Sequence, residues 1–359
     1  MLSLKYVVMQ HFHLCNHYLG VLVNSRCGVL VYRASVGITT NMRFEATKWI
    51  AENADSMGVH RIWMGEDIDI GQDIFVLAAS MLLHTKGVKI GTGIVPIAVH
   101  RISTLARGTL SLQEIGEGRF AFGTGIGGIQ DLKKLGIQLK KPVTTLRETM
   151  QCLRELWAGK TVTIQNELFT LDGYSLGPSV KTSIPIFLGV RGPQMLRLAG
   201  EVADGVILSG PLDYLRYAVK EINQAATNAG RISSDVEKVA WIPTIPTFRG
   251  GKESLAKKVV AIVVADMPDQ ILDMLSVDRA KIDHLRSAVE SGGPDAGIPL
   301  IDDELIDTFA IAGGLEHMVD MFEQIAALGL TEVVLGPPFS GNWRAAMKEI
   351  LGEISSRSE

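Results

Sequence analysis

Glycine-rich turns follow several apolar, strand-like runs of this 359-residue chain and are its first candidates for binding chemistry. GTG lies at 91–93, GTGIGG at 123–128, and GVRGP at 189–193 places Arg191 directly before a helical pattern. A turn without side chains lets a large, flat ligand approach the backbone, and backbone N–H groups at a helix N-terminus can hold a phosphate. The turns together therefore indicate a site for a flat, phosphate-bearing ligand. Any single turn could also be an ordinary connection between a strand and a helix.

Alternating strand-like and helix-like segments must position these turns, and the alternation runs from residue 33 to the end of the chain. The expected strands are short, apolar runs, typical of a parallel sheet buried on both faces, at 33–39, 60–65, 88–93, 119–125, 184–190, 204–210, 238–247 and 331–338. The expected helices follow them at 43–57, 72–84, 103–115, 145–158, from Pro193, at 212–229 and 253–275, and from Trp343.

Two segments interrupt this alternation, a hairpin pattern at 161–176 and a polar helical pattern at 278–310. Eight strand–helix units predict an α/β fold of the (β/α)₈ TIM-barrel type with insertions, and a doubly wound open sheet is the alternative. In a TIM barrel all the glycine turns lie at the C-terminal ends of the strands, where active sites form. The fold prediction therefore gathers the turns into one site.

Composition excludes several classes of function. A net charge of −4 and an isoelectric point near 6.1 argue against a nucleic-acid or anionic-membrane partner. No run reaches 18 uninterrupted apolar residues, so no membrane span is expected. Three scattered cysteines, Cys15, Cys27 and Cys152, argue against a disulfide framework and for the cytoplasm.

The first 32 residues lack a clear period and are interpreted as an N-terminal extension of unknown role, separate from a barrel domain at 33–359. His11, His13, Cys15 and His17 would share one side of a strand and could bind a metal. Metal ligands are usually positioned by a packed core, so we interpret these residues as incidental and expect no metal site.

Three quoted stretches carry a family resemblance: VKIGTGIVPIAVHRISTLARGTLSLQEIGEGRFAFGTGIGG, LGIQLKKPVTTLRETMQCLRELWAG and IPIFLGVRGPQMLRLAGEVADGVILSG. They resemble the bacterial-luciferase-like superfamily, and within it the coenzyme F420-dependent methylenetetrahydromethanopterin reductases. The C-terminal stretch ending in TEVVLGPP supports the narrower assignment, and the resemblance covers about residues 33–352.

The resemblance implies an oxidoreductase that transfers a hydride between a deazaflavin, coenzyme F420, and a small one-carbon pterin. It also implies a non-prolyl cis peptide at Gly93–Ile94 that bulges against the cofactor ring, and a homo-oligomer. The implied cofactor-binding residues are Thr39, Gly93, Ile94, Gly123, Thr124, Gly125, Gly189, Arg191 and Gly192. Of these, Gly189, Arg191 and Gly192 would hold the phosphate-bearing tail.

The chain departs from the reductase pattern at two carboxylate positions, which are occupied here by Thr39 and Gly128. Acids remain at the end of the second expected strand, so Glu66 and Asp67 are the catalytic candidates, unless they are solvated or helix-capping acids. His100 and Arg101 follow the expected cis turn, where they could bind substrate or phosphate or serve a structural role.

Two other functions stay open at this point. An FMN-dependent monooxygenase of the same superfamily would use FMN in place of F420, together with a reductase partner and oxygen. A non-catalytic cofactor-binding or partner subunit is compatible with the missing carboxylates. The sequence alone does not identify the substrate or the direction of the reaction.

Overall fold

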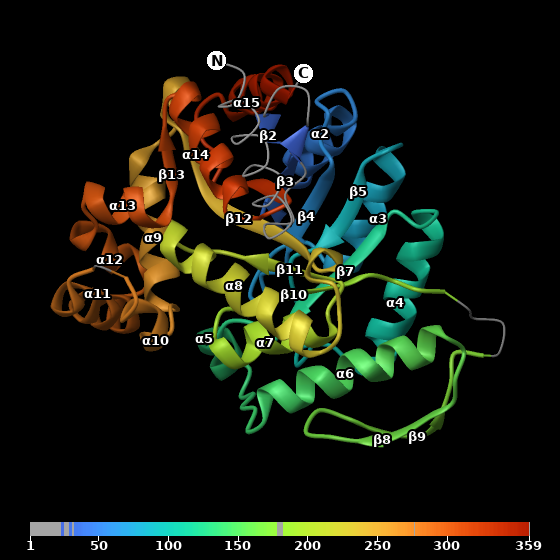
Figure 1. Ribbon diagram of the computed structural model, residues 1–359. Helices are drawn as coiled ribbons and strands as arrows, with labels where there is room; N and C mark the ends of the chain where they lie inside the picture. The colour runs from blue at the N-terminus through green and yellow to red at the C-terminus, as the bar shows by residue number, and fades with distance from the viewer. Residues whose placement is uncertain (1–22, 25–28, 31, 178–181, 276, 359) are drawn as a thin grey trace, which may run out of the picture.

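The computed structural model describes residues 23–24, 29–30, 32–177, 182–275 and 277–358. Eight parallel strands form a closed barrel, because β10 pairs with β11 on one side and with β7 on the other (Figure 1). The barrel strands are β3 (Arg33–Thr39), β4 (Arg61–Gly65), β5 (Lys89–Thr92), β7 (Phe120–Gly125), β10 (Ile186–Gly189), β11 (Gly205–Leu208), β12 (Glu237–Pro246) and β14 (Glu332–Gly336). The predicted (β/α)₈ barrel is confirmed, and the open sheet is excluded.

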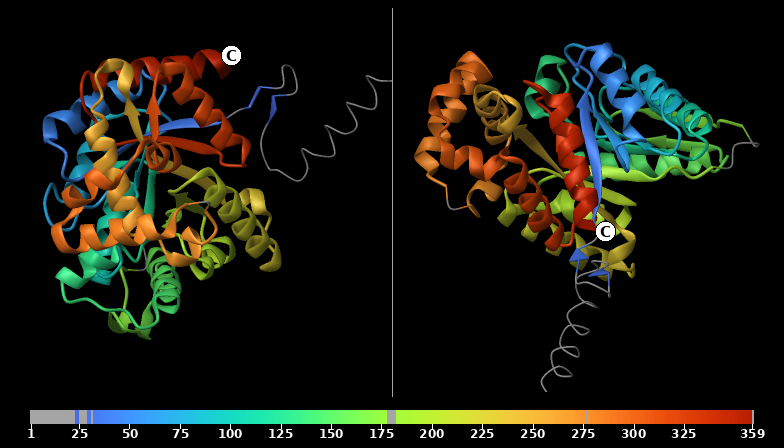
Figure 2. Two further views of the ribbon diagram at one scale, coloured as in Figure 1. Left: turned by 90° about the vertical axis from the view of Figure 1, so that its left-hand side faces the viewer. Right: turned by 90° about the horizontal axis from the view of Figure 1, so that it is seen from above.

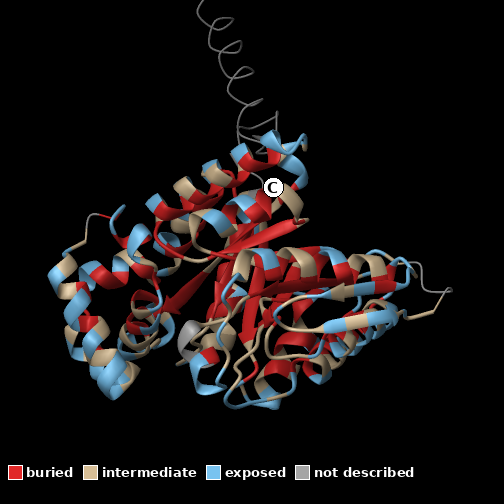
Figure 3. Ribbon diagram, turned by 90° about the horizontal axis from the view of Figure 1, so that it is seen from below, coloured by how far each residue is buried: buried red, intermediate tan, exposed pale blue. Residues whose placement is uncertain are grey.

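A helix packs outside the barrel after each strand, and Figure 3 shows buried strands enclosed by helices that each keep one buried face. In α6, for example, Leu146, Met150, Leu153 and Trp157 recur at helical spacing and are all buried. The eight outer helices are α2 (Phe44–Ala54), α3 (Ile74–His84), α4 (Ile102–Ile115), α6 (Pro142–Trp157), α7 (Pro193–Val202), α8 (Leu212–Asn228), α14 (Leu315–Ala327) and α15 (Trp343–Ser358).

Two insertions stand on different sides of the barrel, as both panels of Figure 2 show. One is the antiparallel hairpin of β8 (Val162–Gln165) and β9 (Thr170–Tyr174). The other, between β12 and α14, is mainly helical and contains α9 (Glu253–Ala265), α10 (Asp269–Leu272), α11 (Arg279–Gly292), α12 (Pro294–Gly297), α13 (Asp303–Phe309) and β13 (Ile311–Gly313). The hairpin was predicted at 161–176. The second insertion begins earlier than the predicted 278–310, because the segment expected as the barrel helix, 253–275, belongs to it, and the outer helix after β12 is α14, which was not predicted.

Several local expectations are corrected. Helix α4 begins at Ile102 with Arg101 at the N-cap position, so Ser103 is not the cap. The helical pattern expected over 253–275 is interrupted at Pro268, because proline cannot continue the hydrogen-bonded helix. Short strands β6 (Val95–Pro96) and β13 were not predicted, since two or three residues leave no periodic signal. Helix α5 (Ile129–Lys134) and three 3₁₀ turns complete the barrel domain.

Little of the N-terminal extension is described. Strands β1 (Val23–Asn24) and β2 (Val29–Leu30) pair in an antiparallel fashion, and β2 lies against α14 and α15. The histidines and the cysteine at positions 11–17 lie outside the described residues. The division into an extension and a barrel domain stays a prediction.

Large aromatic side chains fill the barrel interior, and glycines on neighbouring strands make room for them. A Cβ atom on Gly91 would lie 2.5 Å from the Trp63 ring, and one on Gly205 would lie 2.1 Å from the Phe187 ring. The two rings meet edge to face with their centroids 5.0 Å apart. Many glycines of this chain therefore serve packing inside the barrel, since any side chain there would collide with an aromatic ring.

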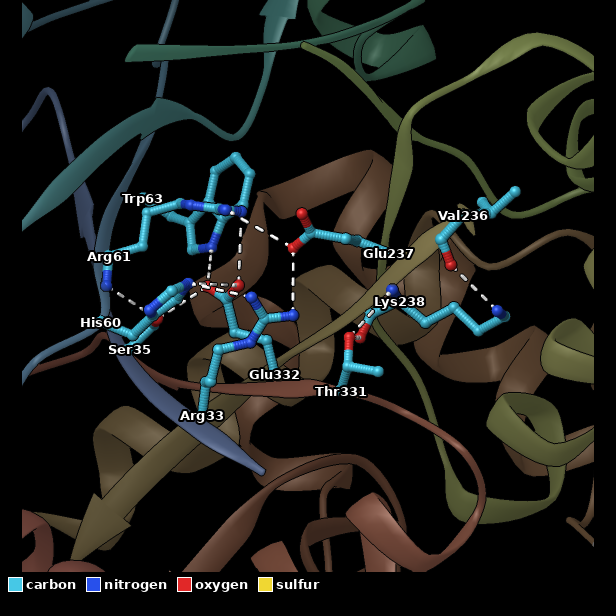
Figure 4. Close-up of polar contacts among 10 residues, drawn as sticks. All are labelled: Arg33, Ser35, His60, Arg61, Trp63, Val236, Glu237, Lys238, Thr331 and Glu332. Carbon is cyan, nitrogen blue, oxygen red and sulfur yellow. Dashed lines mark hydrogen bonds and ion pairs between the residues drawn. The ribbon is translucent and has the colours of Figure 1, made fainter. Parts of the chain in front are cut away.

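A buried charge cluster lies at the N-terminal ends of the strands, opposite the glycine turns (Figure 4). Glu332 is fully buried and accepts hydrogen bonds from Ser35 Oγ at 2.7 Å and Trp63 Nε1 at 2.6 Å. Arg61 Nη1 lies 3.3 Å from Glu332 Oε2, and its guanidinium stacks 4.7 Å above the centre of the Trp63 ring. At this face of a TIM barrel such contacts stabilise the fold and do not take part in catalysis.

His60 makes the stability of this cluster dependent on pH. Burial, followed by repulsion from Arg61 and Arg33, lowers the pKa of His60 from 6.5 to about 3. Arg33 Nη1 lies 3.3 Å from His60 Nε2, and because a guanidinium only donates, the imidazole accepts in its neutral form.

Between pH 6.5 and 3 unfolding therefore binds a proton at His60, and stability falls as the pH falls. The free energy of unfolding should decrease by up to about 1.4 kcal/mol per pH unit from this group alone. The measurement is urea unfolding from pH 7 to pH 4 for the wild type and H60Q, and the stability of H60Q should fall less steeply with decreasing pH because it lacks this group. H284Q, which alters an exposed histidine, should retain the wild-type pH dependence; a slope unchanged in H60Q would contradict the assignment.

Candidate active site

The turn after the third barrel strand is built around a cis peptide bond between Gly93 and Ile94, as the family resemblance implied. Two backbone hydrogen bonds join it to the neighbouring strand β4 and the loop that follows. Gly93 N–H donates to Met64 O at 2.6 Å, and Glu66 N–H donates to Ile94 O at 3.2 Å. The turn and the acid-bearing loop after β4 therefore form one connected unit at the barrel mouth.

Trp241 on β12 lies beneath this turn and forms the uppermost layer of the barrel interior. A Cβ atom on Gly93 would lie 2.7 Å from the indole, and Cβ atoms on Gly37 and Gly336 would lie 2.5 and 2.6 Å from it. The indole is only half-buried. Trp241 was not predicted as a site residue, although the tryptophan inside the strand-like run KVAWIP was a signal for it.

Ile94 extends from the cis turn toward the strands β7 and β10. A Cβ atom on Gly125 would lie 2.9 Å from Ile94 Cδ1, and one on Gly189 would lie 2.5 Å from Ile94 Cγ2. Thr124 is fully buried, and its hydroxyl donates to Val95 O at 2.7 Å. These predicted site residues are brought together, but their visible role is to seat the turn.

Glycine is required at position 123 for a different reason: a Cβ atom there would lie 1.8 Å from the Thr92 carbonyl oxygen on the neighbouring strand β5. Thr39 ends β3, and its hydroxyl donates to Asn41 Oδ1 at 2.9 Å. Both residues lie at the C-terminal face of the barrel, as expected. Their contact with a cofactor stays a prediction.

The N-terminus of α7 is open to an anion. Gly192 occupies the N-cap position without a side-chain cap, and Pro193 begins the helix. A Cβ atom on Gly192 would meet nothing within 4 Å, unlike those on Gly93, Gly123, Gly125 and Gly189. Packing therefore accounts for the other predicted glycines, whereas the space beside Gly192 is free.

Arg191 precedes this helix and is half-buried. Within the described ranges its guanidinium has no hydrogen-bond or ion-pair partner. Its backbone is held in place, because the buried Tyr214 hydroxyl donates to Arg191 O at 3.1 Å and lies 3.4 Å from Val190 O. An anchored cation without a counter-ion beside a free helix N-terminus is suited to a phosphate.

The two candidate acids have different environments. Asp67 accepts from Asn41 N–H at 3.1 Å, and its own N–H donates to Thr40 Oγ1 at 2.8 Å, so it connects the loops after β3 and β4. Glu66 instead pairs with His100, whose Nε2 lies 2.8 Å from Oε1 and 2.9 Å from Oε2. The side chains of Glu66 and His100 remain 11% and 16% exposed. Glu66 is thereby paired with a second titratable side chain, and the catalytic role of either acid stays a prediction.

Other possible sites do not coincide with these residues. A cavity of about 310 Å³ lies outside the barrel wall between α8, α13 and α14, and none of the predicted site residues lines it. In the part of the chain that the structure describes, no group of three His, Cys, Asp or Glu side chains could hold a metal ion. No described helix has the length and apolarity needed to cross a bilayer.

The fold is a (β/α)₈ barrel that carries Arg191 beside the uncapped N-terminus of α7 at the C-terminal ends of its strands. The chain belongs to the luciferase-like monooxygenase family, whose profile matches residues 26–332.

Similar proteins include the 5,10-methylenetetrahydromethanopterin reductase of Methanolobus tindarius, which is 30% identical over 85% of this chain and 94% of the relative. The reductase of Archaeoglobus fulgidus is 28% identical over 88% of this chain and 96% of its own length. The solved coenzyme F420-dependent tetrahydromethanopterin reductase of Methanopyrus kandleri has the same fold, with a TM-score of 0.81 at 22% identity, covering 92% of this chain and 99% of that one.

Proposed function

We propose that the protein is an F420-dependent oxidoreductase that transfers a hydride between the deazaflavin and a small substrate, a methylenetetrahydromethanopterin-type one-carbon pterin. The family membership and the reductases named among its relatives support this assignment. Coenzyme F420 appears in the names of further relatives, including a putative oxidoreductase of Mycobacterium tuberculosis that is 25% identical over 74% of this chain.

The observation that carries the proposal is the unpartnered Arg191 beside the open N-terminus of α7. This arrangement fits the phosphate of a cofactor tail, and the cis turn at Gly93–Ile94 with Trp241 beneath it would back the ring. When bound, the deazaflavin supplies two-electron hydride chemistry. The protein binds, orients and desolvates the reactants, and Glu66 is the acid available for a proton at a substrate nitrogen.

Fluorescence quenching tests this proposal. Purified protein should bind F420 at micromolar concentration or tighter, and bind FMN more weakly. R191A should weaken F420 binding by about 10–100-fold, because a charge-assisted hydrogen bond contributes about 1.5–3 kcal/mol. R197A is the matched control, since Arg197 lies on the same helix but pairs with Glu221, and its affinity should equal that of the wild type.

Each other outcome has a definite meaning. Preference for FMN would assign the protein to the monooxygenase branch of its family. Binding of neither cofactor would overturn the cofactor hypothesis. Equal affinity of R191A and the wild type for F420 would remove Arg191 from the phosphate site.

We further propose a homo-oligomer in the cytoplasm. Helix α3 presents two large apolar side chains to solvent seven residues apart, Val76 at 69% exposure and Leu83 at 73%, with Ile70 at 72% close in the sequence. Such a face is suited to a second copy of the chain. The buried free thiol of Cys152 agrees with a reducing compartment. A monomeric mass by light scattering would contradict the oligomer.

A further inference from the structure

Glu66 and His100 form a hydrogen-bonded pair of titratable side chains at the barrel mouth, and their geometry suits proton transfer. His100 lies between the cis turn and α4, whereas Glu66 follows β4. Both carboxylate oxygens lie within hydrogen-bond distance of one nitrogen, Nε2, at 2.8 and 2.9 Å. A carboxylate only accepts, so Nε2 carries the hydrogen.

The imidazole is held in one orientation. Phe75 on α3 packs edge to face against it, with the ring centroids 5.5 Å apart at 86°. Phe75 is itself fixed against α4, because a Cβ atom on Gly108 would lie 2.9 Å from its ring. The hydrogen bonds to Glu66 and the contact with Phe75 together fix the plane of the His100 ring.

The second ring nitrogen is available. Among the described residues, no group hydrogen-bonds to His100 Nδ1. With the side chain 16% exposed, one nitrogen contacts the acid while the other is free to exchange protons with water or substrate. Glu66 is also bonded through its backbone to the Ile94 carbonyl, so the pair is physically continuous with the cis turn.

We propose that His100 is a proton relay that returns a proton to Glu66 from solvent during turnover; this inference rests on the proposed function. In the reductive direction the bridging C–N bond of the substrate breaks, the carbon gains a hydride from the reduced deazaflavin, and the nitrogen gains a proton from Glu66. To reload Glu66, His100 Nε2–H passes its proton to the carboxylate while Nδ1 takes up a proton from water, and the imidazole then regains its Nε2–H form by proton exchange with water. One proton is thus taken from solvent per turnover, and it is balanced by the proton that is released to solvent when the reduced deazaflavin is oxidised by loss of a hydride.

The sharpest test compares two substitutions of His100. H100Q keeps an N–H donor for Glu66 but cannot relay, whereas H100A creates space for added imidazole. Both should bind F420 like the wild type and lower kcat for methylenetetrahydromethanopterin reduction by about 10²-fold or more, the size of a general acid–base contribution. Imidazole should restore kcat in H100A, with KM unchanged. H284Q, which alters an exposed histidine distant in the sequence, should leave turnover unchanged.

A second measurement does not depend on turnover. Long-range ¹H–¹⁵N spectra of histidine-labelled protein should show His100 as the Nε2–H tautomer, and a neutral Nδ1–H tautomer would overturn the proposal. Wild-type kcat in H100Q, or H100A that imidazole does not rescue, would also overturn it and reduce His100 to a structural residue. If the wild type binds no F420, the proposed function fails instead, and the binding titration distinguishes the two failures.

Discussion

Replacing Glu66 with glutamine should lower kcat by about 10²–10⁴-fold, the range that positioned acid–base groups contribute. In the wild type His100 Nε2 lies 2.8 and 2.9 Å from the two Glu66 oxygens. Glutamine keeps the side-chain volume and one oxygen that can accept from Nε2–H, but its amide cannot take up and release a proton. Affinity for F420 should change by less than about twofold, because Glu66 contacts the turn through its backbone and binding by Arg191 is unaffected. Steady-state kinetics with reduced F420 and the methylene pterin, together with the quenching titration, provide the comparison.

Asp67 offers a matched control one residue away. In D67N the side-chain oxygen can still accept from Asn41 N–H, and the loop connection persists. We expect a loss of only a few-fold in kcat. Equal losses in the two variants would mean that the whole loop, and not the Glu66 carboxyl, is required; a fully active E66Q would eliminate Glu66 as the acid.

The second large effect concerns stability at the opposite end of the barrel. Replacing Glu332 with alanine should lower the free energy of unfolding by about 3–5 kcal/mol, because the buried Arg61 would keep only the partly exposed Glu237, 3.5 Å away, as a counter-ion. Arg61 is 2% exposed, and Ser35 and Trp63 would also lose their acceptor. Urea unfolding followed by circular dichroism measures the loss.

Two further variants separate charge from packing. R61M/E332L replaces the ion pair with apolar side chains of similar volume and should recover the part of the loss that comes from the unpaired Arg61 charge, whereas Ser35 and Trp63 would still lack their acceptor. E237A removes a carboxylate whose side chain is 33% exposed, and it should cost no more than about 1 kcal/mol. An E332A variant as stable as E237A would show that the buried cluster contributes little to the fold.

The sequence was sufficient for the fold because the signals of a parallel barrel are local. Eight apolar runs separated by helical periods define the order of elements, and Gly192–Pro193 defines the start of α7. The cis turn at Gly93–Ile94 was also placed correctly, through the family resemblance. The short strands β6 and β13 were not predicted, since they form only by pairing with β7 and β12, which are distant in the sequence.

The site was less accessible from sequence. The glycine pattern predicted where the mouth lies, but it could not distinguish Gly192, beside open space, from Gly125 and Gly189, which pack against Ile94. Likewise, Glu66 and Asp67 are adjacent acids, and the sequence does not show which of them contacts another titratable side chain.

Only the tertiary structure turns Glu66 toward His100, 34 residues away, and Asp67 toward the loop after β3. It also places Trp241 beneath a turn nearly 150 residues earlier in the chain. The physical reason is that backbone conformation follows from short-range patterns, whereas side-chain partners depend on how the closed barrel brings its strand ends together. The sequence determined the barrel and the position of its mouth, and the packing of the strand ends decided which side chains act there.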